Sequence, residues 1–204
     1  MTTALIVVDV QKDFLPGGAL AVPRGDEVIP VVNLLMPHFS TVVLTADWHP
    51  AHHASFAAQH PGKAPYETVE MPYGTQVLWP VHCVAGTPGA DFADGLETKA
   101  AHAVIRKGTE AGCDSYSGFL AADRRTPTGL AGYLKTRGVT RVCVCGLATD
   151  FCVAWTAQDA AAQGFETFLI EDASRAIDVN GSLEAALRAC AKAGVTVIRS
   201  EAVL

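Results

Sequence analysis

The chain has 204 residues, of which 50% are hydrophobic and 18% are charged, and its formal net charge is −6. This composition is typical of a globular protein with a sizeable core and excludes a disordered chain. Because the charge is mildly acidic and no basic stripe occurs, we expect neither a nucleic acid nor a membrane as partner.

The N-terminal residues lead directly into an apolar run, without the basic start and small-residue cleavage site of a secretory signal. No apolar stretch is long enough to span a bilayer, so we expect a soluble, cytoplasmic protein. None of the six cysteines has CxxC spacing, and in a reducing compartment we expect most of them to be free thiols.

Six short runs rich in β-branched residues predict strands that are buried on both faces. In chain order, these runs are Leu5–Asp9, Val42–Ala46, Ala103–Lys107, Val142–Gly146, Thr167–Ile170 and Val195–Arg199. Helices are expected between several of them, at Asp26–Met36, Thr128–Arg137, Thr149–Gln163 and Leu183–Ala193. Gly138, Gly164 and Gly194 directly follow three of these helices, where a terminating glycine is expected.

Strands that alternate with helices predict an α/β fold with a parallel sheet. We expect a single domain over residues 1–204: a three-layer sandwich with a six-stranded, mostly parallel sheet and helices on both faces. Residues 48–100 are the least regular part and are rich in His, Pro and Gly. An irregular stretch of that length is usually functional.

Reactive side chains stand where four of the predicted strands end. Asp9 closes the first strand, Asp47 follows the second, Lys107 closes the third, and Cys152 lies early in the helix after the fourth. In an open parallel sheet, ligands bind beyond the carboxyl ends of the strands. We therefore expect these four side chains to meet at one edge of the sheet.

Cys152 is a candidate nucleophile, because the N-terminus of a helix stabilises both a thiolate and an oxyanion. Thr149, three residues earlier, is the expected N-cap. Asp9 is suited to accept the thiol proton, and Lys107 is suited to orient Asp9 and to lower the pKa of the thiol. Two plainer interpretations stay open: Cys152 as a core residue, and Asp9 with Lys107 as a structural ion pair.

Asp47 and His49 are candidate metal ligands, because residues two apart at a strand end point to the same side. His82 is the third ligand that we select. Other histidines of the irregular stretch compete with it: His52, His53 and His60. Aromatic side chains close in sequence to these residues are suited to border a flat ring: Phe14, Trp79, Tyr116 and Phe151.

Five segments carry a resemblance over essentially the whole chain. They are ALIVVDVQKDF (4–14), DWHP (47–50), WPVHC (79–83), RKG (106–108) with SYSGF (115–119), and GLATDFCV (146–153). In this order they resemble the nicotinamidase/pyrazinamidase branch of the isochorismatase-like cysteine hydrolases. The resemblance implies hydrolysis of nicotinamide, and of pyrazinamide, through a cysteine thioester.

The resemblance also implies a role for each residue. Cys152 is the expected nucleophile, Asp9 the proton shuttle and Lys107 its partner. One divalent ion, with zinc favoured over iron or manganese, is expected on Asp47, His49 and His82. A cis peptide is expected before Ala148, whose amide would form the oxyanion hole with that of Cys152. Phe14, Trp79 and Tyr116 would border the ring.

Several points stay open at this level. His53 either joins the metal ligands or supports them from outside, and a homo-oligomer is possible. Another amidase of the superfamily, acting on a maleamate, a carbamoyl compound or a hydroxynicotinamide, would use the same triad. A non-catalytic ligand-binding protein on the same fold is a further alternative. Cys152 argues against isochorismate cleavage, since the isochorismatases of the family lack this cysteine.

Overall fold

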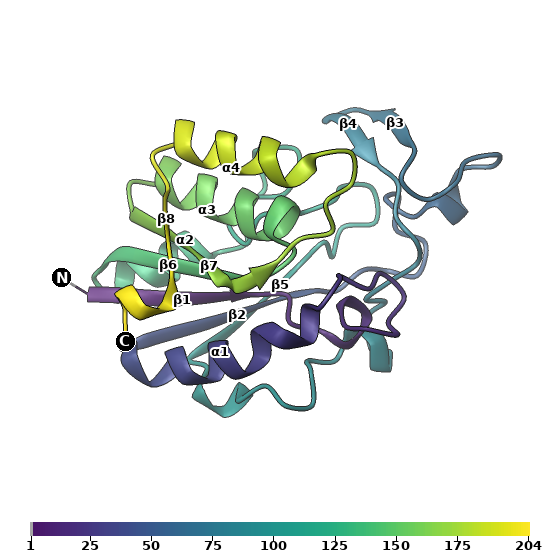
Figure 1. The fold of residues 1–204 in the computed structure, drawn as a ribbon. Coiled ribbons are helices and arrows are strands. Elements are labelled where there is room, and N and C mark those ends of the chain that lie inside the picture. The colour runs from purple at the N-terminus through teal and green to yellow at the C-terminus, as the bar shows by residue number, and fades with distance from the viewer. Residues whose placement is uncertain (1) are drawn as a thin grey trace.

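A six-stranded sheet forms the middle layer of the computed structural model, which describes residues 2–204 (Figure 1). The strands stand in the order β5–β2–β1–β6–β7–β8, and every neighbouring pair is parallel. In chain order they are β1 (Thr2–Val8), β2 (Thr41–Asp47), β5 (Ala103–Lys107), β6 (Val139–Leu147), β7 (Glu166–Arg175) and β8 (Thr196–Ile198). The predicted six strands are confirmed, and the sheet is wholly parallel.

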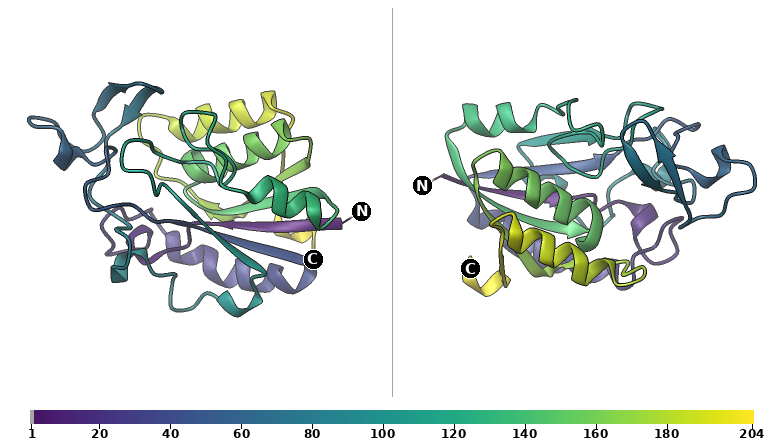
Figure 2. Two further views of the ribbon diagram at one scale, coloured as in Figure 1. Left: turned by 180° about the vertical axis from the view of Figure 1, so that it is seen from behind. Right: turned by 90° about the horizontal axis from the view of Figure 1, so that it is seen from above.

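Helices cover both faces of the sheet, as predicted (Figures 1 and 2). Alternate residues of β1 point to opposite faces, so Leu5 and Val7 join the core under α1, while Ala4 and Ile6 join the other core. Helix α1 lies alone on its face, and the other three lie opposite. The bounds are α1 (Val28–Leu35), α2 (Leu130–Thr136), α3 (Ala154–Ala162) and α4 (Ser182–Lys192).

The segment after β6 differs from the prediction of an α-helix capped by Thr149. Residues Thr149–Val153 form a π-helical turn, its N-cap is Ala148, and no side chain caps it. The amides of Phe151 and Val153 both donate to the Ala148 carbonyl oxygen, at 3.1 Å each. The prediction of Thr149 as the cap is therefore wrong, and α3 begins only at Ala154.

A second, two-stranded sheet was not predicted. Strands β3 (Thr68–Met71) and β4 (Gly74–Val77) form an antiparallel hairpin beyond the carboxyl edge of the main sheet (Figure 1). Their side chains are mostly exposed, so they lack the apolar runs that identify the main strands. Among residues 2–204, no helix has the length and apolar character needed to cross a membrane.

Candidate active site

The carboxyl edge of the sheet brings together the four reactive side chains of the sequence. Asp9 directly follows β1, Asp47 ends β2, Lys107 ends β5, and Cys152 lies in the turn after β6. These four strands are neighbours in the sheet, so their ends converge. All four side chains are buried, and none is more than 7% exposed.

Lys107 lies at the centre of this cluster. Its Nζ is 2.8 Å from Asp9 Oδ2 and 2.5 Å from Asp47 Oδ1. The same nitrogen donates to the Ser115 carbonyl oxygen at 2.9 Å and lies 3.4 Å from Cys152 Sγ. One buried cation thus contacts two carboxylates and the candidate nucleophile at once.

The two carboxylate oxygens of Asp9 differ in their hydrogen bonding. Thr45 Oγ1 donates to Asp9 Oδ1 at 2.6 Å. Within residues 2–204, Asp9 Oδ2 is a buried oxygen for which no hydrogen bond has acceptable geometry, although Lys107 is close. Burial raises the pKa of Asp9 above its ordinary value, with Lys107 opposing the rise and Asp47 adding to it. This carboxylate is therefore suited to accept a proton.

The other charges of the cluster follow from burial and pairing. Burial alone would raise the pKa of Asp47, but Lys107 and His49 outweigh it and lower that pKa well below its usual value. Burial opposes the charge of Lys107, yet Asp47 and Asp9 raise its pKa well above the ordinary value. An ionised Asp47 and a protonated Lys107 are the result.

The thiol of Cys152 differs from expectation. Burial raises the pKa of Cys152 well above its ordinary value; Lys107 lowers it and Asp9 raises it further. The predicted lowering of the thiol pKa by Lys107 is present, but burial has the larger effect, so the pKa of the free site is raised. The thiol keeps its proton until a base next to it takes the proton away.

Three donor atoms form a candidate metal centre beside the cluster. Asp47 Oδ2 lies 3.5 Å from His49 Nε2 and 3.8 Å from His82 Nε2, and the three ligand atoms lie within 4.8 Å of one another. The Nδ1 atoms of His49 and His82 each contact a backbone carbonyl oxygen, that of Gly108 at 2.9 Å and that of Pro80 at 2.8 Å. When Nδ1 carries the proton and donates there, both Nε2 lone pairs face the centre. Two imidazoles and a carboxylate are a donor set that divalent metals bind.

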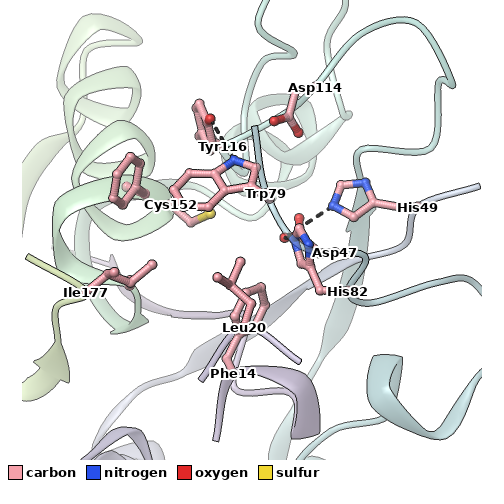
Figure 3. Close-up of a pocket in the computed structure, with 12 residues that line it drawn as sticks. Phe14, Leu20, Asp47, His49, Trp79, His82, Asp114, Tyr116, Cys152 and Ile177 are labelled. Carbon is pink, nitrogen blue, oxygen red and sulfur yellow. Dashed lines mark hydrogen bonds and ion pairs between the residues drawn. The ribbon is translucent and has the colours of Figure 1, made fainter. Parts of the chain in front are cut away.

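A small pocket is lined both by the thiol of Cys152 and by the three metal-donor residues (Figure 3). Cys152 lies on one side, with Asp47 and His82 across from it. Aromatic side chains border it, including the predicted Phe14, Trp79 and Tyr116, together with Phe151.

The aromatic wall is held by polar contacts as well as by packing. Trp79 Nε1 donates to the Tyr116 hydroxyl oxygen at 3.0 Å, and Gln76 Nε2 donates to the same oxygen at 3.0 Å. The ring of Trp79 meets that of Phe151 edge to face, with centroids 4.8 Å apart. Gln76 comes from β4, so the unpredicted hairpin supports the pocket.

His53 packs against His49, one of the three candidate metal ligands. The rings of His53 and His49 lie 4.3 Å apart, and His53 Nδ1 is 2.7 Å from Ser55 Oγ. Burial lowers the pKa of His53 to about 4, and the neighbouring His49 lowers it as well. His53, His49 and Asp114 form a second group of possible ligands, so the open alternatives for His53 both stay possible.

Three pocket residues were missed by the sequence analysis: Leu20, Asp114 and Ile177. Asp114 is 3% exposed and accepts hydrogen bonds from Gln76 Nε2 and from the Ser115 amide. Its proximity in sequence to Tyr116 was an available signal. Ile177 lies in the loop after β7, which also opens at the carboxyl edge, whereas Leu20 gave no signal that we recognise.

The turn that carries the nucleophile has a second expected feature. The peptide bond between Leu147 and Ala148 is cis, as the resemblance implied. Ala148 and Cys152 both line the pocket. Their amides are therefore available candidates for the predicted oxyanion hole.

Comparison with known proteins shows a consistent set of relatives. Residues 3–202 match the family model of the isochorismatase domain. The chain is 53% identical to a nicotinamidase of Acinetobacter baylyi over 201 residues, which are 98% of this chain and 94% of that protein. Its fold aligns with a nicotinamidase/pyrazinamidase of Acinetobacter baumanii at a TM-score of 0.98 and 56% identity, over 100% and 98% of the two chains.

Two further solved structures contain bound groups. A protein of L. infantum in complex with nicotinate aligns at a TM-score of 0.86 and 40% identity, over 98% of this chain and 94% of that one. A pyrazinamidase of Pyrococcus horikoshii in complex with zinc aligns at 0.79 and 40% identity, over 98% and 99%. The first group is a pyridine carboxylate and the second a divalent metal.

Proposed function

The chain belongs to the isochorismatase family, and from that premise we propose that it is a nicotinamidase, also active on pyrazinamide, which hydrolyses nicotinamide to nicotinate and ammonia. One observation carries the proposal. Lys107 Nζ contacts Asp9, Asp47 and Cys152 Sγ together, and the thiol shares one aromatic-walled pocket with the metal donors Asp47, His49 and His82. A nucleophile and an anchor for a ring nitrogen are what hydrolysis of a pyridine carboxamide requires.

The first step activates the thiol. Asp9 Oδ2 accepts the proton of Cys152 Sγ, and Lys107 stabilises the negative charge that develops on sulfur. The sulfur attacks the carboxamide carbon, and the carbonyl π electrons move onto oxygen. The amides of Ala148 and Cys152 are proposed to hold this oxyanion; one such donor contributes roughly 2.7–4 kcal/mol in comparable sites.

The second step releases ammonia and then the acid. The oxyanion collapses, the carbon–nitrogen bond breaks, and Asp9 returns its proton to the departing nitrogen. A thioester between Cys152 and the ring acyl group remains. Asp9 then takes a proton from water, whose oxygen attacks the acyl carbon; the carbon–sulfur bond breaks, the proton passes from Asp9 to sulfur, and nicotinic acid leaves. The acid ionises to nicotinate, and the released ammonia takes up its proton. Atoms and charges balance over the cycle.

Asp47, His49 and His82 are proposed to hold one divalent ion, with zinc favoured by the two-imidazole, one-carboxylate donor set. The zinc-bound pyrazinamidase of Pyrococcus horikoshii supports this choice. Such an ion would supply a positive charge to which a ring nitrogen can bind. Ring position matters, because correct orientation of bound reactants contributes on the order of 7–11 kcal/mol at best.

The proposal is tested by ammonia release from nicotinamide with Cys152→Ala and a matched control, Cys145→Ala. Cys145 is buried in β6 and does not line the pocket. We expect Cys152→Ala to lose at least about 10⁴-fold in kcat, as nucleophile removal does in comparable hydrolases, and Cys145→Ala to keep it. Turnover by Cys152→Ala near the wild-type rate would refute the assignment.

Metal content gives a second, independent readout. His82→Ala is expected to lose bound metal, whereas His52→Ala, which removes an exposed histidine of the same irregular stretch, is expected to retain it. Treatment of the wild-type enzyme with a chelator is expected to abolish turnover. Equal metal content in the two variants would place the ion elsewhere.

The other amidases of the superfamily are a weaker proposal. A maleamate or carbamoyl substrate has no ring nitrogen, so it gives the donor set of Asp47, His49 and His82 nothing to orient. Activity on such a substrate that survives chelation, with no turnover of nicotinamide, would favour that alternative. The 53% identity to a nicotinamidase favours nicotinamide.

A further inference from the structure

We propose that Asp150 is a positioning residue whose carboxylate holds the loop 176–181 in place, so that Ile177 forms one wall of the substrate pocket. This inference rests on the proposed function, because the wall is defined by the ring that it contacts. Asp150 lies two residues before the nucleophile, in the π-helical turn, and is only 5% exposed. Nothing in the mechanism above uses it.

The carboxylate of Asp150 is bound almost entirely by the loop after β7. The amide of Ile177 donates to Oδ1 at 3.1 Å, and the amide of Asp178 donates to Oδ2 at 2.8 Å. The hydroxyl of Ser182, at the start of α4, also donates to Oδ2. Three donors separated by about 30 residues from Asp150 in sequence thus meet on one charged acceptor, and hydrogen bonds to a charged acceptor are stronger than neutral ones.

The two residues after Asp150 line the substrate pocket. Phe151 and Cys152 both line it, and Ile177 lines it from the loop on the same side as the thiol (Figure 3). Asp150 therefore links the turn that carries the nucleophile directly to the residue that closes the pocket beside it. A displacement of the loop would move Ile177 relative to Cys152.

The loop needs an anchor because its backbone is unusual. Asp178 and Asn180 have φ of 54° and 53°, in the left-handed region, which costs free energy for residues other than glycine. At the other end of the loop, Arg175 donates to Glu27 Oε2 at 2.9 Å. Between these two attachments the loop is mostly half-buried or exposed, and such segments open locally at low cost.

The expected signature is a change in KM larger than the change in kcat. Asp150→Asn keeps the size of the side chain but replaces one acceptor oxygen by an amide nitrogen, which cannot accept from a backbone N–H. Ile177 then loses its fixed position, and the ring is held less well. We expect KM for nicotinamide to rise about tenfold, with kcat changed by less than about threefold, a split that reports lost ground-state binding.

A double-mutant cycle tests whether Asp150 acts through Ile177. If it does, Ile177→Ala alone also raises KM, and adding Asp150→Asn to Ile177→Ala raises KM little further. Effects that multiply fully in the double variant would overturn the proposal, because Asp150 would then act by another route. Asp123→Asn is the matched control: its carboxylate also accepts from two backbone amides, those of Arg125 and Thr126, but in a loop that does not line the pocket, so KM should not change.

Amide hydrogen exchange tests the anchor without any turnover. Asp150→Asn is expected to speed exchange at the amides of Ile177 and Asp178, and exchange in α3 should stay unchanged. Unchanged exchange at both amides would overturn the proposal even in an active enzyme. A wild-type protein that fails to hydrolyse nicotinamide would refute the proposed function and leave this exchange result standing. If Asp150→Asn does not fold, Ser182→Ala removes one donor alone and should raise KM in the same direction by a smaller factor.

Discussion

Gly108→Ala is the substitution whose effect can be worked out most directly from the structure. Gly108 has a φ of +63°, and a Cβ at this position would lie 2.3 Å from His49 Cε1 and 2.5 Å from His49 Nδ1. The same imidazole contacts the Gly108 carbonyl oxygen through Nδ1. Its ring is enclosed, with His53 at 4.3 Å and Phe56 at 5.6 Å between centroids. The ring has little space into which it can move.

The magnitude has two parts. A left-handed backbone costs an alanine about 1–2 kcal/mol, and overpacking of a well-filled site costs about 1–3 kcal/mol, so we expect a loss of about 2–5 kcal/mol in the free energy of unfolding. In a protein of this size that corresponds to a fall in Tm of roughly 4–20 °C. If His49 instead rotates away to relieve the contact, it gives up its carbonyl contact, and metal affinity falls by about 10–100-fold.

The assay pairs thermal unfolding with a metal-binding titration, on Gly108→Ala and on Gly112→Ala as control. A Cβ at Gly112 would meet nothing within 4 Å, so this variant should match the wild type in both measurements. The Gly108 variant must lose stability, metal affinity, or some of each. Wild-type Tm together with wild-type metal affinity would refute the reasoning about His49.

Two other substitutions test the charges around the nucleophile. Lys107→Met leaves the buried carboxylates of Asp9 and Asp47 without their cation. We expect this to lower the free energy of unfolding by about 3–5 kcal/mol. Denaturant titration measures the loss, with Lys99→Met, at an exposed lysine, as the control. Thr45→Val removes the hydrogen bond that lowers the pKa of Asp9, so the acidic limb of the kcat/KM profile should move to higher pH; a shift to lower pH would contradict the role of Asp9 as the base.

The main sheet was predictable because its strands are nearly continuous apolar runs. Every residue of β2 is buried, for example, and its predicted core, Val42–Ala46, falls within it. The predicted strand falls furthest short of the observed one at β7. There the apolar run Thr167–Ile170 is followed by the mostly polar residues Glu171–Arg175, which continue the strand. That extension pairs with β6 beyond an irregularity in register between Val144 and Gly146, which a local pattern does not encode.

Long-range contacts explain what the sequence did not predict. The sequence Thr149–Val153 predicted an ordinary helix start, but the carboxylate of Asp150 accepts hydrogen bonds from the loop after β7. Asp114 lies in an irregular segment and lines the pocket beside Gln76, from which it is separated by 38 residues. Gln76 belongs to the β3–β4 hairpin, which has no apolar pattern. By contrast, Asp9, Lys107 and Cys152 were predictable together, because parallel strands must end at the same edge.

Asp47 belongs to both halves of the site, and this gives a prediction that separates it from the other metal donors. Its Oδ1 is 2.5 Å from Lys107, while its Oδ2 faces the Nε2 atoms of His49 and His82. Asp47→Asn and His82→Gln should both lose metal. In metal-free protein, however, only Asp47→Asn also weakens a charge-assisted contact to Lys107, so it should unfold about 1.5–3 kcal/mol more easily than metal-free wild type.

The comparison is made by denaturant unfolding in the presence of a chelator, so that metal affinity does not enter the result. Metal-free His82→Gln should lose less stability than metal-free Asp47→Asn, because Gln roughly keeps the buried volume of His82 and the carboxylate of Asp47 still accepts from Lys107. Equal losses for the two variants would show that Lys107 draws no stabilisation from Asp47. Lys107 would then be stabilised by Asp9 and the Ser115 carbonyl oxygen, and the metal centre and the catalytic cluster would be independent of each other.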